Sequence, residues 1–162
     1  NDATETNYKN GKISSQILTF ATHGLVAGDF GNLNQGALVL TPPSNSSSSY
    51  DDGLLTASEI SKKLINVDLV ILSACNKIKN NQTPINSLSL SFMFAGANSI
   101  LVSYWPIESK SAVFFTTNLA SLLKKNITNN LSSPFKNTMQ VMIKSKRFSD
   151  PFFWSAFELV SD

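Results

Sequence analysis

The clearest buried strand in the sequence is Val67-Asp68-Leu69-Val70-Ile71-Leu72, which runs directly into Ser73-Ala74-Cys75. A short apolar run rich in branched side chains favours a strand that is buried on both faces. The apolar runs Ile17–Ala21 and Ser99–Tyr104 have the same character, and Ala37–Leu40 is a shorter one. These segments predict a sheet with a buried centre.

Helical patterns separate the strands. Thr56-Ala57-Ser58-Glu59 has the form of a capping box, and Ala57, Ile60 and Leu64 would lie on one face of the helix that it opens. The remaining predicted elements are a helix over 85–95 ended by Gly96, a helix over 108–125, a helix with Ser133 as N-cap and Pro134 at its first position, and a final strand over 153–160. The alternation of strands and helices predicts an α/β fold, with a mostly parallel sheet and helices on both faces.

Composition excludes several classes of protein. The chain has 162 residues, of which 42% are apolar and 15% charged, which is a globular composition sufficient for one domain or part of one. The net charge of +2 comes without a basic run, which argues against nucleic-acid binding, and no apolar stretch is long enough to span a membrane. The sequence also lacks a phosphate-binding loop, a dinucleotide fingerprint and a serine-hydrolase elbow.

The sequence contains one histidine, His23, and one cysteine, Cys75. A disulfide and a zinc cluster of Cys and His ligands are therefore excluded within the chain. Taken alone, each residue is better explained by structure, because free cysteines are usually buried and single histidines are often satisfied loop or core residues.

The two residues become a functional candidate when they are taken together. Each follows a predicted strand at its carboxyl end, and consecutive strands of a parallel sheet are usually neighbours. Both side chains would then reach one crevice at the edge where open α/β folds bind ligands. A nearby imidazole favours the thiolate form of a cysteine, so the pair predicts nucleophilic catalysis.

Gly24 and the peptide N–H of Cys75 complete this prediction. Gly24 leaves the backbone after His23 open, and the two N–H groups could together stabilise an oxyanion, as acyl transfer requires. An ordinary tight turn after the strand explains Gly24 equally well.

Aromatic side chains gather near the end of the chain, at Phe152, Phe153, Trp154 and Phe157. Packing in the core and on the sheet explains them better than a peptide-binding cluster. Trp105 follows the strand that ends at Tyr104, so we expect it near the same carboxyl edge, where it would line the cleft.

The segments around His23 and Cys75 resemble the two signature segments of the CHAT domain family. Members of that family are caspase-like cysteine peptidases, often attached to tetratricopeptide repeats. The resemblance covers roughly residues 15–160. It rests on five segments. These are Ala21-Thr22-His23-Gly24, then 36–40 together with 52–60 as the second, then 68–76, 94–107 and 150–160. The separation of His23 and Cys75 is also close to the roughly 50 residues found in caspases.

The resemblance implies a cysteine endopeptidase of caspase-like type. His23 and Cys75 would be the catalytic dyad, the N–H groups of Gly24 and Cys75 the oxyanion hole, and Asn76 and Trp105 the lining of the cleft. It implies no metal and no cofactor, a protein or peptide substrate, no nucleic-acid or membrane partner, and a place in the cytoplasm. An N-terminal repeat region of the same full-length chain would be a further partner.

The resemblance also implies a domain organisation. The family's domain begins well before the histidine strand, so residues 1–14 would be a flexible polar lead-in and 15–162 the C-terminal part of a caspase-like domain that lacks its first strands. The strand at Ile17–Ala21 would then have an open edge. We expect that residues 1–16 do not fill it.

Two other functions are compatible with the same residues. A catalytically degenerate domain of this family would be a protein-interaction module that keeps the pair. Alternatively, Cys75 would serve acyl transfer on substrates other than peptides.

Overall fold

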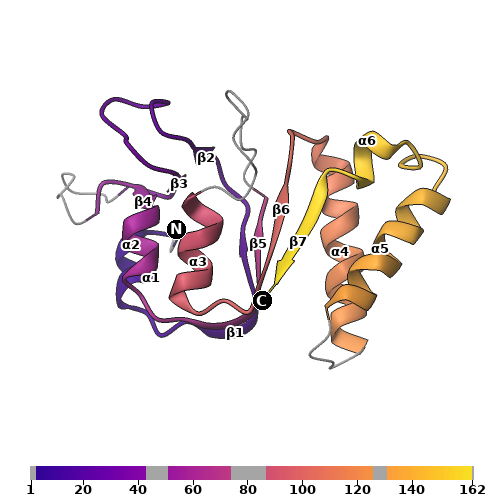
Figure 1. Ribbon diagram of the computed structural model, residues 1–162, viewed down its shortest axis with the longest axis horizontal. Helices are drawn as coiled ribbons and strands as arrows, with labels where there is room; N and C mark the ends of the chain where they lie inside the picture. The colour runs from indigo at the N-terminus through magenta and orange to yellow at the C-terminus, as the bar shows by residue number, and fades with distance from the viewer. Residues whose placement is uncertain (1–2, 43–50, 74–86, 126–130, 162) are drawn as a thin grey trace.

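A computed structural model describes residues 3–42, 51–73, 87–125 and 131–161, and it has two sheets with helices on both sides of the larger one (Figure 1). The larger sheet contains β1, β5, β6 and β7 in that order, with β1–β5 and β5–β6 parallel and β6–β7 antiparallel. These strands cover Ser14–Phe20, Asn66–Leu72, Ser99–Ser103 and Phe157–Ser161. The predicted α/β class and mostly parallel sheet are confirmed.

Helices cover both faces of this sheet (Figure 1). On one face lie α1, α2 and α3, which span Glu5–Asn10, Ala57–Ser61 and Ser87–Ala95. On the other face lie α4 and α5, which span Ser109–Lys125 and Ser132–Lys144, with the short α6 at Pro151–Trp154.

The central strand β5 contributes to two hydrophobic cores because its side chains alternate between the faces. Val70 and Leu72 belong to the core under α1–α3, whereas Leu69 and Ile71 belong to the core under α4 and α5. All four side chains are buried. The apolar run therefore forms a strand covered on both sides, as the sequence predicts.

The smaller sheet is antiparallel and lies on the α1–α3 side (Figure 1). It consists of β2, β3 and β4, which cover Gly24–Leu25, Ala37–Val39 and Leu54–Thr56. The strand predicted at Ala37–Leu40 is thus real, but it pairs outside the main sheet.

Four local predictions are wrong in detail. The run at Ile17–Ala21 is not buried on both faces, because it lies in the edge strand β1, where every side chain but the last is exposed or half-buried. Leu64 is 88% exposed, because α2 ends at Ser61 and does not carry the expected helical face that far. Helix α5 begins at Ser132, so Pro134 stands third instead of first, still within the turn whose N–H groups have no helical acceptor.

The predicted strand 153–160 begins only at Phe157. The residues before it form α6, since Asp150 accepts a hydrogen bond from the Phe152 N–H (2.8 Å) and Pro151 stands at the first helical position.

Helix α1 was not expected. Its first and fourth residues, Glu5 and Tyr8, are buried against the rest of the domain, so this part of the polar lead-in is folded. Among the described residues ahead of β1, none pairs with its outer edge, and residues 14–16 belong to β1 itself. The division of the domain at residue 14 stays a prediction.

Candidate functional site

The carboxyl ends of β1 and β5 lie side by side. Phe20 and Leu72 are the last paired residues of the two strands, and the Ser73 N–H continues the pairing by donating to the Phe20 carbonyl at 3.0 Å. His23 follows Phe20 by three residues, and Cys75 follows Leu72 by three. In every β1–β5 pair the two partners are separated by the same number of residues along the chain. His23 and Cys75 are separated by that number too.

His23 is exposed and lies between β1 and β2. Its carbonyl accepts a hydrogen bond from the Val39 N–H at 2.9 Å, and the hydroxyl of Thr22 donates to the Val39 carbonyl. Both backbone groups of Val39 thus hold the segment that carries the imidazole. The small sheet therefore holds the backbone of His23 through contacts that no sequence pattern indicated.

Gly24 begins β2 and pairs with Leu38. Because the bond between Val39 and His23 flanks this pair, Gly24 and Leu38 form the non-hydrogen-bonded kind of antiparallel pair. The Gly24 N–H then points away from β3. Among the described residues β2 is an edge strand of its sheet, so this N–H points away from the other strands of that sheet, and its role as an oxyanion donor stays a prediction.

Cys75 and Asn76 lie outside the described residues. Their contact with His23 and their roles in catalysis and in lining the cleft stay predictions.

Trp105 follows β6, the strand next to β5, and is half-buried. Its indole Nε1 donates to the Phe152 carbonyl at 3.1 Å, and the Trp105 and Phe152 rings lie 5.9 Å apart. The ring therefore packs on α6, and its role as cleft lining stays a prediction.

The remaining aromatic side chains support the packing interpretation in part. Phe157 is buried and stacks on Phe115 with 3.8 Å between ring centroids. Phe153 and Trp154 pack against the same core, whereas Phe152 is half-exposed beside Trp105.

A polar cluster that sequence reasoning missed anchors the small sheet to α1. The buried Glu5 carboxylate accepts from the Gly53 N–H at 2.6 Å, and Lys9 bridges Glu5 and Glu59 at 2.9 and 2.6 Å. The carboxylate of Glu59 also accepts from the Thr56 N–H at 2.9 Å, as the predicted capping box requires. The i,i+4 spacing of Glu5 and Lys9 and the capping box are local signals, whereas the bonds of Glu5 to Gly53 and of Lys9 to Glu59 join residues far apart in the chain.

Charge and burial act in opposite directions on this cluster. Burial favours a lower pKa for Lys9, but its hydrogen bonds to Glu59 and Glu5 outweigh this and raise it. For Glu59, burial favours a higher pKa, and the hydrogen bonds from Lys9 and Thr56 outweigh it and lower the pKa. Both groups are therefore held in their charged forms.

Other kinds of site find no support in the described parts of the chain. No three His, Cys, Asp or Glu residues gather there as a metal site would need. None of the helices described is long and apolar enough to cross a bilayer.

Comparison with known proteins agrees with this architecture. The model of the CHAT domain family matches residues 1–162. The chain is 29% identical over 162 residues to tetratricopeptide repeat protein 28 of Mus musculus, covering 92% of this chain and 6% of that protein. It is 30% identical over 109 residues to the protein of the same name from Homo sapiens, covering 66% of this chain and 4% of that protein.

The chain thus spans only a small fraction of the length of these relatives. CHAT domains are related to caspase-like peptidases, which accords with the α/β sheet and the position of His23 at its carboxyl edge. The match over the whole length shows that the chain belongs to the CHAT domain family.

Proposed function

We propose that this chain is a cysteine endopeptidase of caspase-like type, with His23 and Cys75 as its catalytic dyad. The observation that carries the proposal is the register of β1 and β5, whose last pair, Phe20 and Leu72, precedes the two residues by equal distances along the chain. Adjacent parallel strands lie about 4.8 Å apart, so residues that leave them at equivalent positions can reach a common substrate.

In the proposed reaction, the Cys75 thiolate attacks the carbonyl carbon of the scissile peptide bond. His23, as the imidazolium, gives its proton to the leaving amine, and a thioester with Cys75 remains. The neutral imidazole then takes a proton from water, whose oxygen attacks the thioester and releases the carboxylic acid. The dyad returns to its starting state without a metal or a cofactor.

The backbone N–H groups of Gly24 and Cys75 stabilise the oxyanion in this mechanism. Support comes from the ladder geometry, which directs the Gly24 N–H away from β3. A donor fixed in a strand costs little reorganisation when charge develops on the substrate oxygen.

The small sheet supports catalysis by holding the His23 backbone. The N–H and the carbonyl of Val39 each make a hydrogen bond to this segment. Its strand β3 pairs with β4, and α1 anchors the start of β4 through the bond between Glu5 and Gly53. The backbone of His23 is thus linked through the strands of the small sheet to the buried Glu5 carboxylate.

Substrate and partners belong to the same proposal. Protein or peptide substrates would meet Asn76 and Trp105 in the cleft, and the reaction would take place in the cytoplasm. The names of both relatives contain tetratricopeptide repeats, so a repeat region of a longer chain is the proposed intramolecular partner.

The test is cleavage of a peptide library by the full chain, with Cys75→Ala and His23→Ala as matched variants. Cleavage that both variants abolish is the expected result. Equal cleavage patterns for wild type and Cys75→Ala would refute the endopeptidase. If none of the three proteins cleaves peptides but Cys75 turns over a non-peptide thioester or ester, acyl transfer replaces the endopeptidase as the function of the chain. If Cys75 is inert, the function is that of the interaction module.

A further inference from the structure

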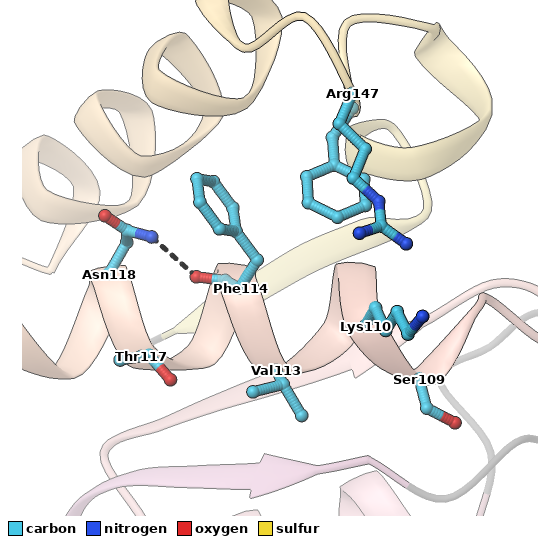
Figure 2. A pocket seen from close by; sticks show the side chains of 8 residues that line it. Ser109, Lys110, Val113, Phe114, Thr117, Asn118 and Arg147 are labelled. Atoms are coloured by element: carbon cyan, nitrogen blue, oxygen red, sulfur yellow. Dashed lines mark hydrogen bonds between the residues drawn. The ribbon is translucent and has the colours of Figure 1, made fainter.

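A groove of about 630 Å³ lies along α4, on the face of the large sheet opposite α1–α3 (Figure 2). Helix α4 forms one wall, and the segment after α5 forms the other. The lining residues are Ser109, Lys110, Val113, Phe114, Thr117, Asn118, Arg147 and Phe148. None of these residues belongs to the proposed catalytic site.

The middle of the groove is apolar. Val113 is 63% exposed, although the same helix buries Phe115 and Leu119 completely in the core. Phe114 lies beside it on the groove and meets the Phe148 ring at 5.2 Å between centroids. Val113 therefore offers apolar surface that the domain's own core does not use.

One end of the groove is cationic. Lys110 and Arg147 both lie there in Figure 2, and the lining contains no acidic side chain. Arg147 is the only arginine among 13 basic residues of the chain. Its guanidinium lies 5.2 Å from the centre of the Phe148 ring, an arrangement that restricts its orientation.

The pairing of Arg147 with Glu108 leaves this end able to bind an anion. One guanidinium nitrogen lies 3.3 Å from the carboxylate, and the two side chains are 58% and 44% exposed. An exposed pair of this kind contributes little, and a guanidinium has five N–H donors. A carboxylate from a partner could thus bind in bidentate geometry.

We propose that this groove is a docking site for an acidic peptide segment of a partner protein. Carboxylates of the segment pair with Arg147 and Lys110 at the cationic end. A large apolar side chain next to them packs on Val113. The charged and the apolar contacts of the segment are adjacent, because the cationic end and the apolar middle of the groove follow one another along α4.

The test is fluorescence anisotropy of the full chain with a short fluorescein-labelled peptide in which two glutamates precede a leucine and a phenylalanine. A second peptide carries lysines in place of the glutamates. We expect saturable binding of the acidic peptide, weakened about three- to tenfold by Arg147→Lys, which keeps the charge but loses the planar fork. Val113→Ser should weaken it by a similar factor, whereas Lys136→Gln, an exposed change on α5, should have no effect.

Equal binding of both peptides, no binding of either, or binding unaffected by Arg147→Lys and Val113→Ser would overturn the proposal. Co-sedimentation with anionic phosphatidylserine vesicles tests the competing occupant. Vesicle binding that depends on Arg147, without peptide binding, would assign the groove to a membrane surface instead. All variants change exposed side chains, so their thermal melting should match the wild type and any loss of binding can be attributed to the groove.

Discussion

Phe20 and Leu72 are the last paired residues of β1 and β5, and each precedes one member of the proposed dyad by three residues. The hydrogen bond from the Ser73 N–H to the Phe20 carbonyl extends the pairing one step toward the dyad. The two strands therefore end level with each other, each three residues ahead of one member of the proposed dyad along the chain.

The first prediction concerns the reactivity of Cys75. If His23 is its partner, alkylation by iodoacetamide should reach half its maximal rate at a pH below the value of about 8.5 that is typical of free cysteine. His23→Ala should move the midpoint upward. The same midpoint in both proteins would show that the imidazole does not act on the thiol.

The second prediction concerns Thr22, a positioning residue. Thr22→Val removes the hydroxyl that binds the Val39 carbonyl and keeps the shape of the side chain. We expect kcat to fall about fivefold, the equivalent of a hydrogen bond worth about 1 kcal/mol, with KM little changed. Thr22→Ser should restore kcat, and Thr19→Val, an exposed change on β1, is the matched control. A fall in melting temperature with unchanged kcat would limit Thr22 to a structural role.

The third prediction concerns the charged cluster of α1. Lys9→Met leaves the buried Glu5 and the partly buried Glu59 without their cation, which should destabilise the domain by about 3 kcal/mol at neutral pH. Lys62→Met, an exposed change on the same side of the domain, should cost less than about 0.5 kcal/mol. Urea unfolding measures both, and equal stabilities of the two variants would contradict the role of the cluster.

The pH dependence of the same cluster provides a fourth prediction. The pKa of Glu59 is lowered in the folded state, so its contribution is complete above its unfolded pKa, about 4.3, and is lost as pH falls through the folded pKa. The pKa of Lys9 is raised, so its contribution is complete below about 10.4 and is lost as pH rises through the folded value. In Lys9→Met both losses should shrink. If Lys9→Met loses as much stability at acid pH as the wild type does, the lowered pKa of Glu59 does not depend on Lys9.

The fifth prediction compares two glycines with positive φ. Gly96 ends α3 with φ +108°, and a Cβ there would lie 2.6 Å from the Ile65 carbonyl oxygen. Gly28 has φ +82° and open space around it. Gly28→Ala should therefore cost about 1 kcal/mol of strain, whereas Gly96→Ala should cost about 3 kcal/mol or more. Urea unfolding tests the order, and equal losses would show that the contact with Ile65 relaxes freely.

Several features of the fold could be predicted because they depend on neighbouring residues. The apolar run around Val70 and the capping box of Thr56 and Glu59 form where the sequence indicates. Gly96 ends α3 because it adopts a φ that other residues avoid. The neighbourhood of the parallel strands could be expected in outline, because strands that follow one another in a parallel sheet are usually adjacent. The small sheet and α2, inserted between β1 and β5, could not.

Other features could not be predicted, because they depend on contacts between distant segments. The strands of the small sheet have two or three residues each, too few for a periodic pattern. The bond between Glu5 and Gly53 joins residues 48 apart. The groove beside Arg147 arises from two segments that pack together only in the folded chain.

The sequence by itself determined the α/β class and the position of His23 and Cys75 shortly after two apolar runs, which form the neighbouring strands β1 and β5, since local apolar runs and turn residues fix where strands begin and end. Only the tertiary structure decided which groups hold His23. Val39 reaches it through a separate antiparallel sheet, and α1 anchors that sheet through a buried carboxylate. Such contacts depend on the burial of polar groups that must find partners across the fold, and no spacing along the chain encodes those partners.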